Sequence, residues 1–266
     1  GGTVIIDGLF NFRDTGGMPL EGGGTTRSGV LFRSDALSGL SPQGLAELAE
    51  TAVGVIVDFR TPAERESAPD RVPDSRPFDV VDLSILEGAV ADSMQQLMKG
   101  GAPSAAELSA AMPTLGGLYV GMLQHGAASF AQVARLIAAS NDEAPTAVLV
   151  HCTAGKDRTG VATALMLDAV GTERAAVVAD YASSQDNLAG PWADGMLRMV
   201  ASFGIPVTPE LGAIVTGTPP EAIEEALDWV DREHGGAAGY LTAAGLTDAE
   251  LDALRARLAG RAAAAA

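Results

Sequence analysis

Two segments of the chain are apolar and rich in β-branched residues over lengths typical of a buried strand. They are Val53–Phe59, which reads VGVIVDF, and Ala147–Val150, which reads AVLV. Short continuous apolar runs of this kind favour strands that are covered on both faces of a sheet. Val30–Arg33 and Val80–Leu83 are further candidates. No convincing strand pattern follows Gly171, so we expect the sheet to be built before that residue.

Helical patterns lie between these strands and continue alone to the end of the chain. Ser41 and Pro42 form the start of a helix to about Thr51, because serine caps a helix well and proline suits its first position. A longer helical stretch at Leu115–Ser140 is expected to break or bend near Gly126. The helices expected after the last strand are Gly160–Ala169, Thr172–Ser184, Trp192–Phe203, Pro219–His234 and Thr247–Leu258.

Strands that alternate with helices predict an α/β fold with a mainly parallel central sheet flanked by helices. The helical C-terminal third, whose last helix starts with a capping box at Thr247 and Glu250, is expected to pack on this sheet. We therefore expect a single domain over residues 1–260 and a low-complexity tail at residues 261–266. The segment Glu87–Met112 is interpreted as loop and short helix.

Composition and charge narrow the classes of function. The chain has 266 residues, of which 47% are apolar and 19% charged, as in ordinary globular proteins. No apolar run approaches the roughly 18 residues that cross a membrane, and no signal peptide is visible, so we expect a cytoplasmic or secreted protein without stable membrane insertion. The net charge of −17 disfavours nucleic acid as a partner. Nothing in the sequence sets the oligomeric state.

The chain contains a single cysteine, Cys152, and three histidines. One cysteine cannot form an intrachain disulfide, and so small a set of ligands argues against a zinc site. We therefore expect neither a metal nor another cofactor.

The candidate chemistry is concentrated in residues 151–160, which read HCTAGKDRTG between an apolar strand and a helix. The backbone N–H groups of a loop in this position converge on one point, where the helix N-terminus adds the positive end of its dipole. The segment is therefore predicted to bind a phosphate group. The residues expected to surround the phosphate are Thr153, Ala154, Gly155, Lys156, Thr159 and Gly160.

Cys152 and Arg158 are the predicted catalytic pair. A thiol at a helix N-terminus beside a guanidinium should be a thiolate near neutral pH, and the thiolate is the nucleophilic form. The planar guanidinium of Arg158 can bind two phosphoryl oxygens at once. Thr159 could donate its hydroxyl to the sulfur, and His151 could orient the loop. The predicted reaction is attack on phosphorus followed by hydrolysis of a phosphocysteine intermediate.

This loop resembles that of the protein tyrosine phosphatase superfamily, in the variant found in atypical bacterial tyrosine and lipid phosphatases. Other segments are similar to the same family: Asn11–Asp14 with Gly16-Gly17, Leu31–Ser34, Asp58–Thr61 with Glu64, Val178–Tyr181 and Gly239–Leu241. The resemblance implies one metal-independent phosphatase domain. It also implies a phosphorylated protein substrate carrying phosphotyrosine or phosphoserine/threonine, with a phosphoinositide as the alternative.

The residue that protonates the leaving oxygen stays open at this point. Asp157 is the nearest carboxyl group, and the resemblance places functional weight on it, although the two neighbouring cations favour its ionised form. Asp82 and Glu87 are the alternatives, because common tyrosine phosphatases carry the acid on a separate loop that would follow Val80–Leu83 here.

Several other residues near these motifs are interpreted as structural. Lys156 either contacts additional phosphates or forms a salt bridge with a nearby carboxylate. We expect a buried polar network of Arg13, Asp14 and Arg33 that positions the loop, with direct contact to the substrate as the alternative. A structural ion-pair set is expected for Asp58, Arg60 and Glu64. The aromatic residues expected in the core are Trp192, Trp229 and Tyr181.

Two other functional classes are open. One is an adaptor that binds phosphate without turnover, against which the intact set of Cys152, Arg158 and Thr159 argues. The other is a sulfur-transfer or arsenate-reducing enzyme. Arsenate reduction normally uses further cysteines, which this chain lacks.

Overall fold

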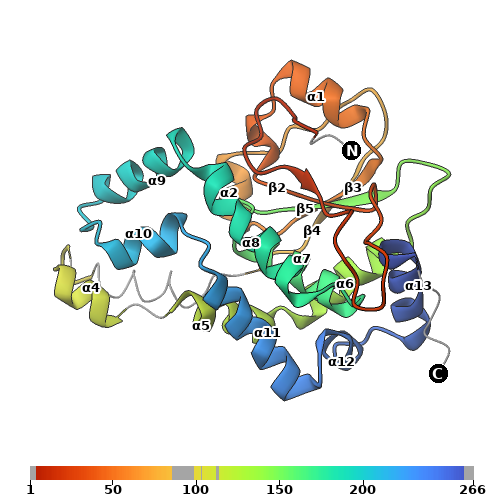
Figure 1. Cartoon of the computed structure of the whole chain (residues 1–266). Coiled ribbons are helices and arrows are strands. Elements are labelled where there is room, and N and C mark those ends of the chain that lie inside the picture. Colours follow the sequence, from red (N-terminus) through yellow and green to blue (C-terminus); the bar gives the residue numbers. More distant parts are fainter. Residues whose placement is uncertain (1–3, 86–98, 103, 112–113, 261–266) are drawn as a thin grey trace.

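The computed structural model describes residues 4–85, 99–102, 104–111 and 114–260. These residues form a five-stranded sheet in the order β1-β2-β5-β3-β4 (Figure 1). The strands are β1 (Arg13–Asp14), β2 (Leu31–Ser34), β3 (Val53–Asp58), β4 (Asp79–Asp82) and β5 (Ala147–His151). All neighbouring pairs are parallel except β1 with β2, which is antiparallel. The predicted mainly parallel sheet is therefore confirmed, with the short edge strand β1 as an addition.

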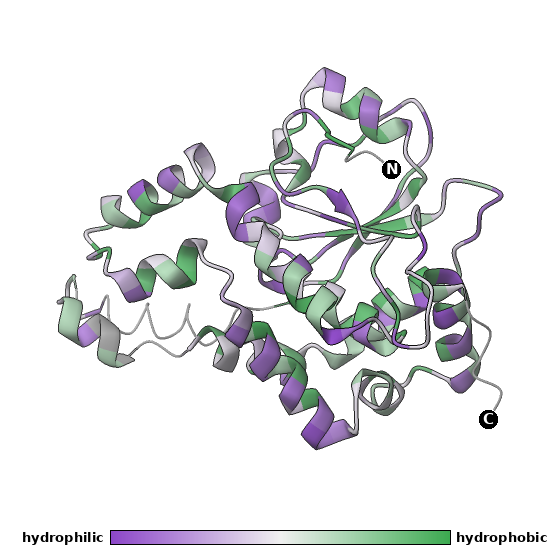
Figure 2. Cartoon of the chain, viewed as in Figure 1, coloured by the Kyte–Doolittle hydropathy of each residue, from purple (hydrophilic) through white to green (hydrophobic). Residues whose placement is uncertain are grey.

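The central strands are mainly apolar because both faces of the sheet are covered. Along β5, Val148 and Val150 belong to the larger core, whereas Leu149 belongs to a smaller core on the opposite face. This division follows from the alternation of side chains along a strand. Figure 2 shows the strands as mainly hydrophobic ribbons between helices that are polar on their outer sides.

Helices of the described residues flank the sheet on both faces. They are α1 (Pro42–Ala49), α2 (Pro62–Ser67), α4 (Ala105–Ala111), α5 (Leu115–His125), α6 (Ala127–Ala138), α7 (Arg158–Ala169), α8 (Arg174–Leu188), α9 (Pro191–Ser202), α10 (Pro209–Thr216), α11 (Pro220–His234), α12 (Ala237–Ala243) and α13 (Asp248–Ala259), with a 3-10 turn at Leu37–Gly39. The predicted cap at Ser41 is confirmed, since its hydroxyl accepts a hydrogen bond from Gly44 N. The predicted break at Gly126 separates α5 from α6.

The sequence analysis missed three short helices, α2, α10 and α12. Two of them begin with a sequence pattern that is typical of a helix N-terminus. Thr61 forms a capping box with Glu64, and Thr208 precedes a proline and caps α10. These helices have six to eight residues, too few for the apolar periodicity on which the prediction relied.

The helices form more than one layer. α6 and α7 pack directly on the sheet, and α1 lies near the opposite face (Figure 1). The C-terminal helices pack mainly on other helices: α11 on α5, α7 and α8, and α13 on α6. They were expected on the sheet itself, but α6 and α7 already cover that face. The boundaries of the expected domain, residues 1–260 with a tail, stay a prediction.

Within the described residues, no helix combines the length and apolar character that crossing a membrane requires. The segment expected as loop and short helix, Glu87–Met112, contains α4, and most of its remaining residues lie outside the described ones.

Candidate active site

The predicted loop lies at the carboxyl edge of the parallel sheet, where open α/β sheets place their ligand sites. Cys152 directly follows β5, the strand between β2 and β3, and Arg158 is the first residue of α7. Residues 152–157 therefore connect the centre of the sheet to a helix N-terminus. The side chain of Cys152 is buried but borders the pocket described below.

The carbonyl oxygens of residues 152–155 all accept hydrogen bonds from groups outside the loop. The donors, in chain order, are His151 Nδ1 at 2.9 Å, Ala36 N at 3.0 Å, Asn11 Nδ2 at 3.2 Å and Arg33 Nη2 at 2.6 Å. The C=O and N–H groups of a trans peptide point in opposite directions, so the amides of residues 153–156 face the other side of the loop. None of the amides of residues 153–157 donates to any residue that the structure describes. They are free to bind an anion.

Gly155 is required by the shape of this loop. Its φ of +73° lies in the left-handed region, and a Cβ at this position would be 2.3 Å from the carbonyl oxygen of Ser34. A side chain would therefore be strained and would collide with the backbone at the end of β2.

Two arginines support the loop from behind. Arg33, which is fully buried, donates from Nη1 to Asp180 at 2.9 Å, and Arg13 Nε donates to the other oxygen of the same carboxylate at 2.9 Å. Two guanidinium groups share one carboxylate, so positive charge is in excess behind the phosphate site. Burial and the neighbouring Arg33 lower the pKa of Arg13 to about 10. The expected buried network is thus present, but Asp14 is outside it and accepts hydrogen bonds from Gly16 N and Gly29 N.

Arg158 forms a bidentate ion pair with Glu64. Its Nη1 and Nη2 atoms each donate to one carboxylate oxygen at 2.8 Å, and Thr153 Oγ1 donates to the same carboxylate at 2.6 Å. Burial alone would raise the pKa of Glu64, but the hydrogen bonds and charge of Arg158 lower it to about 2. Glu64 was expected in a structural ion-pair set with Asp58 and Arg60, and the structure shows that its bidentate ion-pair partner is Arg158. The capping box with Thr61 instead holds its side chain at the start of α2, beside Arg158.

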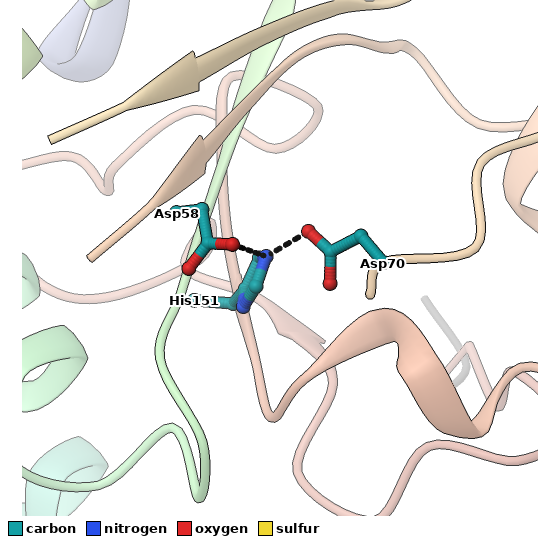
Figure 3. Close-up of side chains that lie close together, drawn as sticks. All are labelled: Asp58, Asp70 and His151. Carbon is teal, nitrogen blue, oxygen red and sulfur yellow. Dashed lines mark hydrogen bonds and ion pairs between the residues drawn. The ribbon is translucent and has the colours of Figure 1, made fainter. Parts of the chain in front are cut away.

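His151 lies between two carboxylates on the other side of the loop (Figure 3). Its Nε2 atom is 2.6 Å from Asp70 and 3.9 Å from Asp58. Burial lowers the pKa of His151, but the hydrogen bond and charge of Asp70 outweigh it, so the net direction is upward. Its Nδ1 atom holds the Cys152 carbonyl, which agrees with the expected orienting role. Asp70 was not identified from the sequence, because no local motif surrounds it.

Asp58, Asp70 and His151 are close enough to share a metal ion. Arg60 already bonds to both carboxylates, at 3.0 Å to Asp58 and 3.2 Å to Asp70. This guanidinium and a protonated imidazole balance the two negative charges. The cluster therefore needs no divalent ion for charge balance, and the absence of a metal from the reaction stays a prediction.

Lys156 has a buried side chain whose ammonium makes three short contacts. It donates to Asp157 Oδ1 at 2.9 Å, to Ile214 O at 2.9 Å and to Gly217 O at 2.8 Å. An ammonium has three protons, so these acceptors use all of them. Of the two interpretations of Lys156, the structure contains the salt bridge. Only its backbone amide is available to a phosphate at this position.

Asp157 and Asp82 differ in their distance from the loop. Asp157 is in the loop and borders the pocket, with its side chain 20% exposed. Asp82 ends β4, does not border the pocket, and is 3.7 Å from Arg65 with a side chain that is 51% exposed. Glu87 lies outside the described residues. Asp157 is thus the candidate acid that the structure places at the site.

Thr159 and Gly160 continue the loop into the first turn of α7. Both are buried, and the hydroxyl of Thr159 has no hydrogen-bond partner in the described part of the chain. The expected bond from this hydroxyl to the sulfur of Cys152 is therefore not formed in this structure. Gly160 packs against the ring of Tyr181, where a Cβ would lie 3.1 Å away.

A pocket of about 740 Å³ opens above Cys152. The loop and Arg158 border one side of it, and most of the remaining wall is apolar. The apolar side chains come from α5, α9 and α10: Leu115, Leu118, Met122, Trp192, Met196, Met199, Ile214 and Val215. Trp192, expected in the core, is a half-buried wall of this pocket, whereas Tyr181 and Trp229 pack in or against the core as expected.

Comparisons with known proteins identify relatives of this chain. The model of a family described as the tyrosine phosphatase family matches residues 4–260. The chain is 32% identical over 242 residues to a tyrosine-protein phosphatase of Nostoc commune, covering 86% of this chain and 74% of that protein. It is 30% identical over 280 residues to the triple specificity protein phosphatase PtpB of Mycobacterium tuberculosis, covering 96% of this chain and 98% of that protein. The match to the crystal structure of P. aeruginosa TpbA covers 76% of this chain and 88% of the TpbA chain, at 18% sequence identity. Its TM-score of 0.35 is too low to support a shared fold.

Proposed function

The chain belongs to the tyrosine phosphatase family, and we propose that it hydrolyses phosphotyrosine with Cys152 as its nucleophile. The observation that supports this most is the loop at residues 152–157. The carbonyl groups of this loop accept hydrogen bonds from residues outside it, and its backbone amides donate to no described residue. These amide donors therefore surround the space next to the sulfur. A dianionic phosphoryl group fits that arrangement of donors.

In this proposal the reaction has two steps that share one carboxyl group. The Cys152 thiolate attacks phosphorus, the S–P bond forms as the P–O bond to the leaving group breaks, and Asp157 gives a proton to the leaving oxygen. Water then attacks the phosphocysteine, Asp157 takes the proton from this water, and the S–P bond breaks. The products are the alcohol, inorganic phosphate and the regenerated thiolate.

The walls of the pocket favour an aryl phosphate. Leu118 and Met122 of α5 face the space above the loop together with Trp192 and Met196 of α9. An apolar wall of this kind gains free energy by removing an aromatic ring from water, which a phosphoserine side chain does not offer. Phosphotyrosine is therefore the preferred protein substrate.

Phosphoinositides are the alternative substrates, and the contacts of Lys156 argue against them. A headgroup with several phosphates needs cations beyond those that hold the phosphate under attack. The ammonium of Lys156 is buried and all three of its protons are donated to Asp157, Ile214 O and Gly217 O, so it is not available to a second phosphate. These contacts favour a substrate with a single phosphate.

The test is hydrolysis in the presence of EDTA, with two peptides that differ only in carrying phosphotyrosine or phosphoserine. We expect turnover of the phosphotyrosine peptide and slower turnover of the phosphoserine peptide. In Cys152→Ser the rate of hydrolysis should fall by at least about a thousandfold. Folding of that variant is checked by circular dichroism. If the wild-type protein binds tungstate but turns over neither peptide, the protein is a phosphate-binding adaptor and the proposal is wrong.

A further inference from the structure

Tyr119 reaches the phosphate-binding loop from outside it. This tyrosine lies on α5, is fully buried, and its hydroxyl is 2.5 Å from Asp157 Oδ1. A carboxylate oxygen can only accept, so the phenol donates. Burial, followed by the charge of Asp157, raises the pKa of Tyr119 well above its ordinary value, and the phenol therefore keeps its proton.

Tyr181 holds Tyr119 in this position. The two hydroxyl oxygens are 2.6 Å apart, and the rings pack edge to face with centroids 5.8 Å apart. Because the Tyr119 proton is directed to Asp157, the Tyr181 hydroxyl donates to the Tyr119 oxygen. The result is a chain of two phenols, running from α8 to α5, that ends on the loop carboxylate.

The two oxygens of Asp157 have different surroundings. Oδ1 accepts from Tyr119 and also from the ammonium of Lys156 at 2.9 Å. Oδ2 accepts no hydrogen bond from any residue that the structure describes, and the side chain borders the pocket. Two donors on one oxygen fix the rotation of the carboxyl group, leaving the other oxygen available for a proton.

We propose that Tyr119 is a positioning residue for Asp157, which holds Oδ1 so that the proton transfers of the reaction take place at Oδ2. This inference rests on the proposed function. In the first step the protonated Oδ2 gives its proton to the leaving oxygen as the P–O bond breaks. In the second, Oδ2 takes a proton from the attacking water as the S–P bond breaks. Tyr119 exchanges no proton in either step.

The variants that test this each replace a single polar group. Tyr119→Phe deletes the donor to Asp157, and Asp157→Asn deletes the carboxylate. Tyr240→Phe is the matched control, because this buried phenol donates to Leu123 O on the same helix α5 without contacting the loop. Each variant is assayed on p-nitrophenyl phosphate across pH, with thermal unfolding as the measure of folding.

We expect Tyr119→Phe to lower kcat about tenfold with KM changed less than about twofold, since one hydrogen bond to a charged group is lost. The kcat–pH profile should move toward higher pH, because a donor that favours the ionised carboxylate is gone. In Asp157→Asn, adding Tyr119→Phe should have no further effect on kcat, because the two residues act through one group. Tyr240→Phe should keep the wild-type kcat and profile.

The proposal is overturned if Tyr119→Phe keeps the wild-type kcat and pH profile, or if its effect multiplies with that of Asp157→Asn. It is also overturned if Tyr240→Phe lowers kcat as much as Tyr119→Phe, which would indicate general loosening of α5. A wild-type protein whose turnover does not depend on Cys152 would instead contradict the proposed function, so the two failures are distinguishable.

Discussion

Glu64 and Arg158 are 94 residues apart in sequence, yet the carboxylate of one accepts two parallel hydrogen bonds of 2.8 Å from the guanidinium of the other. The cation proposed to bind phosphate is therefore oriented before substrate arrives. Such bidentate pairs fix the plane of the guanidinium as well as its position.

This ion pair predicts a stability difference that depends on pH. The pKa of Glu64 falls from 4.5 to about 2 on folding, so the pair stabilises the folded state above pH 4.5 and loses that effect as the pH falls toward 2. We expect Glu64→Gln to lower the free energy of unfolding by about 1–2 kcal/mol at pH 7, allowing for a partly exposed carboxylate. The difference should shrink between pH 4.5 and 2, as measured by urea unfolding.

Glu66→Gln is the control for that measurement. Glu66 is on the same helix α2 but is exposed and forms no ion pair with a described residue. Its substitution should change stability little at any pH. Equal effects of the two substitutions, or a Glu64→Gln effect that does not vary with pH, would contradict the argument.

The pairing of His151 with Asp70 predicts a pH dependence of stability that is opposite in sign to that of Glu64. The pKa of His151 is raised above 6.5, so its pairing with Asp70 contributes fully below pH 6.5 and is lost as the pH rises through the higher value in the folded state. Asp70→Asn should therefore cost about 1–3 kcal/mol of stability near pH 6 and less at alkaline pH. Asp74→Asn, at an exposed position four residues later, is the control. A cost for Asp70→Asn that stays constant from pH 6 to pH 9 would argue against an imidazolium at this site.

The loop itself could be predicted from sequence because its signals are contiguous. An apolar strand, a glycine-containing loop and a helix follow one another within residues 147–169, and this order places Cys152 and Arg158 at the carboxyl edge of the sheet. The buried strands were predictable for the same reason. Their apolar runs match the two covered faces of the sheet.

The partners of the loop could not be predicted in this way. Tyr119, Asp70 and Glu64 are 38, 81 and 94 residues from the groups that they bond. Each is an ordinary polar residue in its own segment, and only the packing of α5, α2 and the β3–β4 connection brings it to the loop. Pairing across such distances depends on the tertiary fold rather than on a local pattern.

Substitutions of Gly155 and Gly171 separate the effect of a strained φ angle from the effect of a steric clash. Gly155→Ala should lower kcat/KM about a hundredfold, because the Cβ would force the loop away from Ser34 and displace the amides. Gly171→Ala is the matched control, since Gly171 has a similar φ of +87° but no atom within 4 Å of the added Cβ. It should cost about 1 kcal/mol of stability and leave kcat/KM unchanged. Comparable activity losses in the two variants would mean that the contact with Ser34 is unimportant.

Trp192 provides the test of the pocket's preference for aryl phosphates. Its half-buried ring borders the pocket at the start of α9, and its removal should lower kcat/KM for p-nitrophenyl phosphate about tenfold by taking apolar contact away from the substrate ring. For a small alkyl phosphate with no ring the same Trp192→Ala variant should change kcat/KM less than about twofold. Phe203→Ala serves as the control, because Phe203 is the C-cap residue of the same helix, is 62% exposed and does not border the pocket. If Trp192→Ala slows both substrates equally, the tryptophan supports the helix and does not contact the substrate ring.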